Sequence, residues 1–497
     1  MVRDFLAKLK KSNKTAIVCG QKTLSYKQWH CLSGKLSKEI LKNACGELVG
    51  LFLPNGITYA VSYFGILYAD KVVVPFYSGS TEDEVIYTIK SCGISTLITT
   101  DEYYSYIENI IRLNKMSMII IVMNNEFEVK RKNFYYMDNA PLSVNEESEL
   151  KDVVVLLHTS GTTSKPKRVM LTNQGLLSNI RSHCESLDFD DKEICLIQLP
   201  MMFGYCNTAQ FLAHVYLGAC IIINANPFLV ADFYKLIEKW KVTNFTAVPS
   251  ILNIIYDSDV LAYDISSLKI ICFGGGPISK KQLLNIIKKF PSIAFVQTYG
   301  LTEAGPRVTT LSPTYCIDKV GSVGQAIPGV EIRIIDAAGN NLSTGELGEV
   351  VVKSQGIMKG YFNCKEESLK IIQGDWLFTG DLGYLSEDGF LYIVGRKKNV
   401  IITGGLNVCP EEVEKTILSY SGIKETKVYG VNDDLLGEKI FADIIVDADI
   451  FNGIQRLKEH CLNKLSGYKV PKKFCIVNNI YRTYNGKIKR ATEKGKI

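Results

Sequence analysis

The sequence lacks several features that would place it in other protein classes. Its longest apolar stretch, residues 209–225, contains His214 and is shorter than the roughly 20 residues that cross a bilayer. Residues 1–14 alternate apolar and basic side chains and lack the apolar segment of a signal peptide. The 14 cysteines form no Cys-x-x-Cys pair and have no histidines at zinc-finger spacing, so we interpret them as reduced core residues. We therefore expect a cytoplasmic protein without a transmembrane segment.

A strong charge of either sign is also absent. Lys and Arg number 57 and Asp and Glu 51, which leaves a net charge of +6. No basic sheet with interleaved aromatics and no recognition helix is apparent, so no nucleic-acid partner is expected. Residues 469–497 hold nine Lys or Arg and one acid, Glu493, and this basic tail is either a solvated surface or a contact for a polyanion.

The length and composition indicate a folded protein of more than one domain. A chain of 497 residues exceeds one ordinary core, and 46% hydrophobic with 22% charged residues is typical of globular proteins. No internal repeat or low-complexity tract interrupts the chain.

Short β-branched runs alternate with helical segments over most of the first four hundred residues. This pattern predicts an α/β fold with two mainly parallel sheets, because parallel strands are covered by helices on both faces. The expected strands are residues 48–53, 96–99, 118–123, 153–157, 219–223, 244–248, 269–273 and 293–297, with a helix at 60–69.

The pattern of expected strands and helices changes after Gly321. Closely spaced strands at 330–334, 348–353 and 389–394, separated by glycine-rich turns, predict a small antiparallel β unit. Beyond the charged segment 395–399 a new pattern begins, with helices at 411–418 and 454–465 and strands at 425–430 and 439–446. We place the boundary near Lys398, which gives a large N-terminal domain, residues 1–397, and a small, mobile α+β C-terminal domain, residues 398–497.

The most informative segment is residues 158–168, which follows the apolar run 153–157. It combines hydroxyl side chains, a glycine and the charges of Lys165 and Lys167, which suits a polyanion such as a phosphate chain. A Walker A loop is excluded because Ser164, Lys165 and Pro166 stand where that motif needs a glycine, a lysine and a hydroxyl residue. Taken alone, such a loop is more often a solvated turn.

Other candidate segments follow predicted strands, where open α/β sheets bind ligands. Residues 274–277 form a glycine-rich turn that leaves bare backbone for a flat base or an acyl chain. Residues 297–303 offer Tyr299 for stacking, a hydroxyl at Thr302 and a carboxylate at Glu303 that suits Mg²⁺. Asp381 follows a tight turn and suits ribose hydroxyls, while Lys487 lies in a flexible basic loop. Each segment has a plain structural interpretation as a turn or a strand end.

In this order the segments resemble the adenylate-forming, or AMP-binding, superfamily, which includes acyl-CoA synthetases, adenylation domains of nonribosomal peptide synthetases and beetle luciferase. The resemblance covers nearly the whole chain, from residues 23–26 to the Lys487 loop. Five motifs carry it: T-S-G-T-T-G-x-P-K-G at 159–168, Y-G-x-T-E at 299–303, T-G-D at 379–381, G-R-x-K…G at 395–405 and G-K-x-x-R at 486–490. Ser164 and Arg168 replace glycines of the first motif, which predicts a stiffer or differently held loop. Tyr481 and Tyr484 stand where prolines often flank the last motif.

The resemblance implies activation of a carboxylic acid by ATP·Mg²⁺ as an acyl-adenylate, followed by transfer to a thiol. Lys487 would bridge the substrate carboxylate and the α-phosphate, while Thr302 and Glu303 would hold the α-phosphate and the metal. The remaining implied ATP-binding residues are Thr159, Ser160, Gly161, Thr162, Thr163 and Lys167 at the outer phosphates, Gly274, Gly275, Gly276, Thr298, Tyr299 and Gly300 near the adenine, and Asp381 and Arg396 at the ribose. Lys398 would be the hinge about which the small domain rotates, bringing Gly404 and Gly405 to a thiol tunnel.

The acid itself is the least readable part of the sequence. Phe203 and Tyr205 lie in the apolar segment 199–205, which indicates a fatty or aromatic acid, although an ordinary core segment has the same composition. Because an unpaired buried ammonium would be costly, we expect an acid without an α-amine. The acceptor is expected to be CoA, with the phosphopantetheine arm of an acyl or peptidyl carrier protein as the alternative. A catalytically inactive nucleotide-binding scaffold is the competing class.

Overall fold

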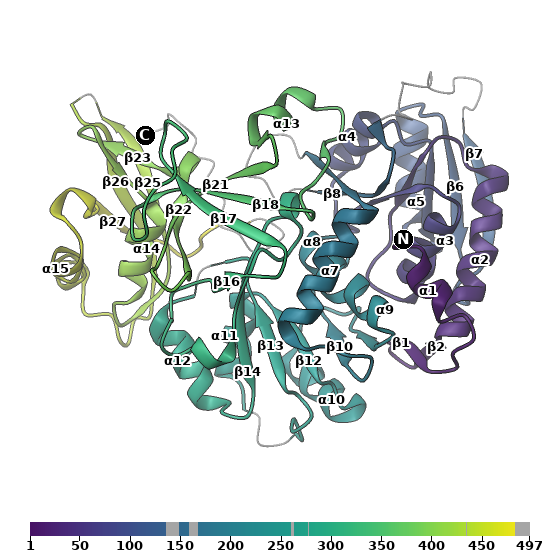
Figure 1. Ribbon diagram of the computed structural model, residues 1–497, viewed down its shortest axis with the longest axis horizontal. Helices are drawn as coiled ribbons and strands as arrows, with labels where there is room; N and C mark the ends of the chain where they lie inside the picture. Colours follow the sequence, from purple (N-terminus) through teal and green to yellow (C-terminus); the bar gives the residue numbers. More distant parts are fainter. Residues whose placement is uncertain (136–148, 159–166, 260–262, 277, 434, 483–497) are drawn as a thin grey trace.

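The computed structural model describes residues 1–135, 149–158, 167–259, 263–276, 278–433 and 435–482 (Figure 1). Within these ranges the strands form four sheets, two large and two small. Figure 1 shows the two large sheets occupying most of the molecule, with the last sheet at the edge opposite the N-terminus. This α/β architecture confirms the fold class predicted from the alternation of strands and helices.

The first large sheet is mainly parallel. Its central strands pair in parallel through β-branched and aromatic residues, as between Ile271 and Phe295, and the edges add antiparallel strands. As far as the described residues show, its nine strands run in the order β16 (Gln325–Ala326), β15 (Thr309–Leu311), β14 (Ala294–Tyr299), β13 (Ile270–Phe273), β12 (Asn244–Ala247), β10 (Ile194–Ile197), β11 (Cys220–Ile223), β1 (Thr15–Cys19) and β2 (Lys22–Ser25).

The second large sheet has the same character. Four parallel pairs make its centre, and Val153–His158 leads into an antiparallel partner that begins at Arg168. Its eight strands, counted over the described ranges, are β19 (Gly360–Tyr361), β9 (Arg168–Thr172), β8 (Val153–His158), β4 (Val72–Pro75), β3 (Leu48–Leu51), β5 (Thr96–Thr100), β6 (Met118–Met123) and β7 (Val129–Tyr135).

One apolar cluster joins the two large sheets. Val49 and Val155 of the second sheet lie in the same cluster as Ile197 and Ile221 of the first. Helix α3 (Ile57–Tyr68) belongs to this cluster, and ten of its twelve residues are buried. A helix that is apolar on all sides is expected in an interior, and here it packs inside this shared core.

Two small sheets complete the fold. An antiparallel sheet, β17 (Val330–Ile335), β18 (Gly348–Ser354), β21 (Trp376–Leu385), β20 (Ile372–Gln373) and β22 (Leu391–Arg396), corresponds to the predicted β unit. The last sheet is built from β24 (Leu406–Val408), β23 (Ile401–Thr403), β26 (Gly437–Val446), β25 (Ile423–Asp433) and β27 (Lys473–Ile476). Its apolar cluster draws only on residues 401–474. The boundary at Lys398 stays a prediction.

The remaining helices cover the sheets. None of the described helices is long and apolar enough to cross a membrane. Their bounds are α1 (Asp4–Lys8), α2 (Tyr26–Asn43), α4 (Glu82–Cys92), α5 (Asp101–Leu113), α7 (Asn173–Leu187), α8 (Gly204–Cys206), α9 (Ala213–Leu217), α10 (Val230–Trp240), α11 (Pro249–Asp257), α12 (Lys280–Lys289), α13 (Lys365–Ile371), α14 (Pro410–Leu418) and α15 (Ile454–Lys464), with a π-helix at Asn207–Leu212.

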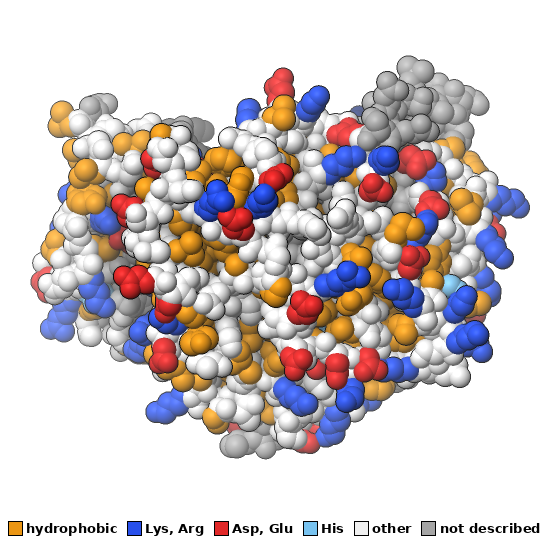
Figure 2. Space-filling model, in the orientation of Figure 1, with side chains coloured by type: hydrophobic (Ala, Val, Ile, Leu, Met, Phe, Trp, Pro, Cys, Tyr) orange, Lys and Arg blue, Asp and Glu red, His pale blue; other side chains and the backbone are white. Residues whose placement is uncertain are grey.

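Charges of both signs share the surface. Figure 2 shows basic and acidic side chains interspersed on the face it presents. Exposed pairs such as Lys353–Asp375 at 2.8 Å are typical of this distribution, and each is expected to stabilise the fold only slightly.

Candidate active site

Three residues from separate segments meet at the end of β14. The Tyr299 hydroxyl donates to Oδ2 of Asp381 at 2.6 Å, and Nε of Arg396 lies 2.5 Å from Oδ1 of the same carboxylate. Asp381 and Arg396 face each other across the antiparallel pair β21–β22, so the sheet register itself aligns the ion pair. The structure thus brings together the residues predicted to hold adenine and ribose.

Burial and charge fix the ionisation of this group. Burial raises the pKa of Tyr299, and the Asp381 carboxylate raises it further, so the phenol stays protonated and donates. Burial is the largest influence on Arg396 and would lower its pKa, but Asp381 together with Tyr299, Glu303 and Glu411 outweighs it, so the net shift is upward. Arg396 also donates to the carbonyl of Thr379 at 3.2 Å, which fixes the guanidinium in place.

Thr302 and Glu303 follow in a short 3₁₀ turn, Thr302–Ala304. Oε1 of Glu303 accepts a hydrogen bond from the Tyr361 hydroxyl at 2.8 Å. A Cβ added at Gly204 would lie 3.2 Å from Oγ1 of Thr302, so the turn is packed closely against α8. Mg²⁺ commonly takes one or two protein carboxylates together with substrate phosphates, and a single glutamate here fits that arrangement.

For the predicted phosphate loop, the structure describes the flanking residues. Thr159, Ser160, Gly161, Thr162 and Thr163 lie outside the described residues, as do Ser164 and Lys165. Because β8 ends at His158 and β9 begins at Arg168, the loop connects two antiparallel strands.

Lys167, at the end of this loop, is held by two residues that the motifs did not reveal. Its Nζ lies 2.5 Å from Oε2 of Glu367 and 4.8 Å from the centre of the Tyr361 ring. Hydrogen bonding to Lys167 and then to Lys370 lowers the pKa of Glu367 to about 2. Tyr361 therefore links the phosphate loop to Glu303, although it lies far from both in sequence.

Arg168, which replaces a loop glycine, does not enter the site through its side chain. It is 3% exposed, and its guanidinium donates to Oγ1 of Thr88 on α4. The departure from the motif is therefore accommodated on the helix-covered side of the sheet.

The glycine-rich turn 274–276 owes its composition partly to packing. A Cβ on Gly274 would lie 2.5 Å from the carbonyl oxygen of Thr298, and Gly275 has a φ of 80°. The hydroxyl of Thr298 donates to the Phe273 carbonyl at 3.1 Å, so it accepts from Tyr205 at 3.0 Å. Tyr205 thus lies against the turn, and Phe203, two residues earlier, is partly buried. The place of both residues in an acyl pocket stays a prediction.

Behind Tyr205 lies Arg307, which sequence reasoning missed. The Arg307 side chain is fully buried, and its Cζ lies 5.0 Å from the centre of the Tyr205 ring. Its Nε donates to Nδ1 of His183 at 3.1 Å. The available signal was a charged residue four positions after Glu303, two residues before the short strand β15.

The predicted hinge and tunnel residues lie at the start of the last sheet. Lys398 is part of the 3₁₀ turn Lys397–Asn399, and its pKa is lowered by burial and then by the Arg396 charge. Glu349 accepts both from Lys397 Nζ at 2.7 Å and from the backbone N–H of Gly380.

Gly404 and Gly405 form the β23–β24 turn with φ values of 58° and 80°, which favour glycine. The structure places Leu436 beside Gly404 and does not bring this turn into contact with Tyr299 or Asp381 through any described interaction. Lys487 lies outside the described residues.

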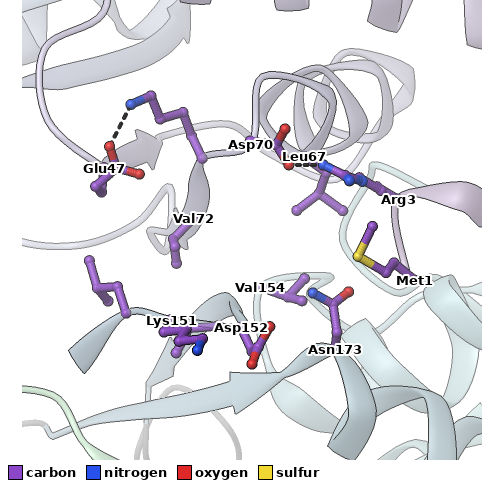
Figure 3. Close-up of a pocket in the computed structure, with 13 residues that line it drawn as sticks. Met1, Arg3, Glu47, Leu67, Asp70, Val72, Lys151, Asp152, Val154 and Asn173 are labelled. Carbon is purple, nitrogen blue, oxygen red and sulfur yellow. Dashed lines mark hydrogen bonds and ion pairs between the residues drawn. The ribbon is translucent and has the colours of Figure 1, made fainter. Parts of the chain in front are cut away.

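A separate surface cavity of about 340 Å³ lies elsewhere in the fold (Figure 3). It is lined at the amino ends of β4 and β8, and it holds the ion pairs Lys71–Glu47 at 2.8 Å and Arg3–Asp70. Ligands of open α/β sheets bind at the carboxyl ends of strands, which is where Tyr299 lies. The cavity therefore contains none of the predicted site residues.

Comparison with known proteins adds independent findings. The family model described as AMP-binding enzyme matches residues 7–362, and the model of the AMP-binding enzyme C-terminal domain matches residues 412–487. A long-chain-fatty-acid–CoA ligase of Bacillus subtilis (strain 168) is 31% identical, covering 90% of this chain and 84% of its own. A 2-succinylbenzoate–CoA ligase of Bacillus cereus (strain Q1) is 30% identical, covering 99% and 96%.

Solved structures agree in fold. The O-succinylbenzoate coenzyme A synthetase of Bacillus subtilis in complex with AMP has a TM-score of 0.84 and 25% identity, over 99% of this chain and 98% of its own. The same enzyme with the acyl-adenylate intermediate also has a TM-score of 0.84 and 25% identity, over 100% and 99%.

Proposed function

The chain belongs to the AMP-binding enzyme family, and we propose that it is an acid–thiol ligase that forms an acyl-adenylate from ATP and a carboxylic acid and then transfers the acyl group to CoA. Pyrophosphate leaves in the first step and AMP in the second. The observation that carries the proposal is the convergence of Tyr299, Asp381 and Arg396 at one strand end. CoA is the acceptor in the proposal because the relatives that match nearly full length are CoA ligases.

Nucleotide binding follows from the charges and donors at this strand end. In the proposal, the Tyr299 ring stacks on adenine, and Asp381 accepts from the ribose hydroxyls while Arg396 orients its carboxylate. Glu303 would hold Mg²⁺, which neutralises phosphate charge when it is bound with ATP. Lys167 would exchange its contact with Glu367 for the outer phosphates. These roles align the reactants and offset charge, which is the main requirement of phosphoryl chemistry.

Lys487 and Lys398 have the roles that the family resemblance implies. Lys487 would bring the acid carboxylate to the α-phosphate by balancing their mutual repulsion. Rotation at Lys398 would then withdraw Lys487 and bring Gly404 and Gly405 toward the adenylate. The boundary between the domains, and the hinge, are part of this proposal.

The substrate is proposed to be a fatty or aromatic acid without an α-amine. Tyr205 contributes an aromatic surface, and the charged group beside it is the cation of Arg307. A substrate ammonium placed here would meet a like charge in a low-dielectric interior, which is strongly unfavourable.

The proposed location is the cytoplasm. All 14 cysteines are free thiols, which fits a reducing compartment.

ATP–pyrophosphate exchange with a panel of carboxylic acids tests the first half-reaction. Thioester formation is then measured with free CoA and, in parallel, with a phosphopantetheinyl carrier protein. We expect exchange with acids that lack an α-amine and transfer to free CoA. Absence of exchange with every acid would overturn the proposal. Transfer to the carrier protein alone would show that the carrier, and not CoA, is the acceptor.

A further inference from the structure

Arg307 is a buried cation whose terminal amino groups have no hydrogen-bond acceptor in the part of the chain that the structure describes. The residue is 0% exposed, and Nη1 and Nη2 have no hydrogen-bond partner among the described residues. No described carboxylate forms an ion pair with it either. Leaving a guanidinium buried without an anion is costly, because a lost charge–water interaction has to be replaced inside the protein.

The titratable neighbours of Arg307 do not supply the missing charge. His183 accepts from Arg307 through Nδ1, so its proton is on Nε2, which lies 3.0 Å from the Ala209 carbonyl. Burial and then the Arg307 charge lower the pKa of His183 well below its usual range, which keeps it neutral. Burial also raises the pKa values of Tyr205 and Cys272 more than Arg307 lowers them. All three neighbours are therefore uncharged at neutral pH.

The Tyr205 ring offsets only part of the cost. A cation over an aromatic face recovers less free energy than the burial of a charge costs. Arg307 also lowers the pKa of the Tyr205 hydroxyl through its charge and a weak hydrogen bond, but neither Nη1 nor Nη2 has a hydrogen-bond partner of standard geometry among the described residues.

The backbone holds Arg307 rigidly. A Cβ on Gly305 would lie 2.6 Å from the Asn179 side chain, and one on Gly300 would lie 2.3 Å from the Pro306 carbonyl oxygen. Asn179 in turn donates to the Arg307 carbonyl at 2.8 Å. A preorganised cation of this kind loses little freedom when it binds an anion.

Arg307 lies one aromatic ring away from the reacting end of the site. Tyr205 is partly exposed, and its hydroxyl contacts Thr298 on β14, while the adjacent Gly204 packs on Thr302. An acid whose activated carboxylate lies near Thr302 would therefore extend along Tyr205 toward Arg307.

We propose that Arg307 is the anion-binding group of the acyl pocket and that the acid carries a second carboxylate, which pairs with Nη1 and Nη2 once Tyr205 moves aside. This inference rests on the proposed function and narrows its substrate class to dicarboxylic acids. The second carboxylate stays unreacted and serves recognition.

Matched acids test this with the unaltered enzyme. 2-Succinylbenzoate and 3-benzoylpropanoate differ only in the aromatic carboxylate, and α,ω-dicarboxylic acids are compared with monocarboxylic acids of equal length. We expect kcat/KM in ATP–pyrophosphate exchange to favour the diacids by on the order of 100-fold, because a site built for a charge rejects an analogue that lacks it. Equal or better activity with the monoacids would overturn the subsite and leave the ligase function standing.

Arg307→Met provides the second arm, with Arg307→Lys as the charge-retaining control. Arg307→Met should lose about 100-fold in kcat/KM for the diacid and little for the monoacid, with an unchanged KM for ATP. Its thermal midpoint without acid should equal or exceed that of the wild type, because an unpaired buried charge is removed. Equal losses on both acids, or a variant that does not fold, would indicate a structural arginine and overturn the proposal.

Thermal unfolding with 2-succinylbenzoate separates the subsite from the reaction. If no acid supports exchange but this diacid raises the midpoint of the wild type and not of Arg307→Met, the subsite stands and the ligase proposal fails. If no acid supports exchange and no diacid raises the midpoint, both proposals fail.

Discussion

At the ribose end of the candidate site Asp381 contacts both Tyr299 and Arg396, whereas at the acyl end Arg307 meets no carboxylate of the described residues. At the first end the charges of Asp381 and Arg396 are already paired within the chain. At the second end, on the proposal, the positive charge of Arg307 is balanced by a carboxylate of the substrate. On the proposed function, nucleotide recognition is therefore preorganised by the register of β21 and β22, whereas acid selection depends on the anion that pairs with Arg307.

Removing the carboxylate of Asp381 is expected to have the largest effect. It leaves Arg396 without its anion, as Arg307 is at the acyl end. Asp381→Ala should lower kcat/KM for ATP by on the order of 10²–10³-fold, through loss of the ribose contact and of the aim of Arg396. Exchange kinetics measure this, with Asp375→Ala, an exposed acid near the start of the same strand, as the matched control. A loss below 10-fold would show that the nucleotide is held elsewhere.

A substitution at the proposed hinge is expected to affect the two half-reactions differently, although both use the same site. Lys398→Pro should leave exchange largely intact and slow thioester formation by on the order of 100-fold, because proline restricts the backbone rotation that brings the thiol in. Both rates are measured on one preparation, and Lys398→Ala, which keeps backbone freedom, is the control. Equal losses in both half-reactions would contradict the hinge.

Much of this organisation could be predicted from sequence. The run Met118–Met123 is a strand with the expected bounds, because six consecutive apolar residues bury both faces of a parallel strand. The β1–β2 hairpin was not predicted, since β1 gains its place by pairing with β11 some two hundred residues later. No local pattern reports such a partner.

The same limit applies to the site. Tyr299, Asp381 and Arg396 belong to motifs and were predicted, and the structure brings them together. Tyr361 and Glu367 were missed because their roles come only from tertiary contacts with Glu303 and Lys167. Arg307 was missed because burial, which a sequence does not display, is what makes an ordinary arginine unusual.

A milder change at the ribose end removes one hydrogen bond of the group formed by Tyr299, Asp381 and Arg396. Tyr299→Phe keeps the ring and loses the donor to Asp381, so KM for ATP should rise about 5-fold, the equivalent of about 1 kcal/mol. Initial rates at varied ATP measure it. An unchanged KM would mean that the phenol contributes by stacking alone.

The smallest effect is expected at the exposed pair Lys167–Glu367. The pKa of Glu367 is lowered to about 2 in the folded chain, so its stabilising contribution is present above the ordinary carboxyl range and is lost as pH falls toward 2. Glu367→Gln should therefore unfold at slightly lower urea than wild type at pH 7, with a difference that shrinks between pH 5 and pH 3. A difference that grows on acidification would contradict the sign of this linkage.

The Glu349 carboxylate accepts from Lys397 and from the backbone of Gly380, so one side chain clamps the strand that bears Asp381 to the residue just ahead of Lys398. On the proposed mechanism, the strand that carries the ribose-binding Asp381 is therefore connected directly to the hinge, with no loop between them that could absorb a movement. Release of AMP would therefore act directly on the hinge at Lys398. The return rotation of the small domain would then depend on release of the nucleotide.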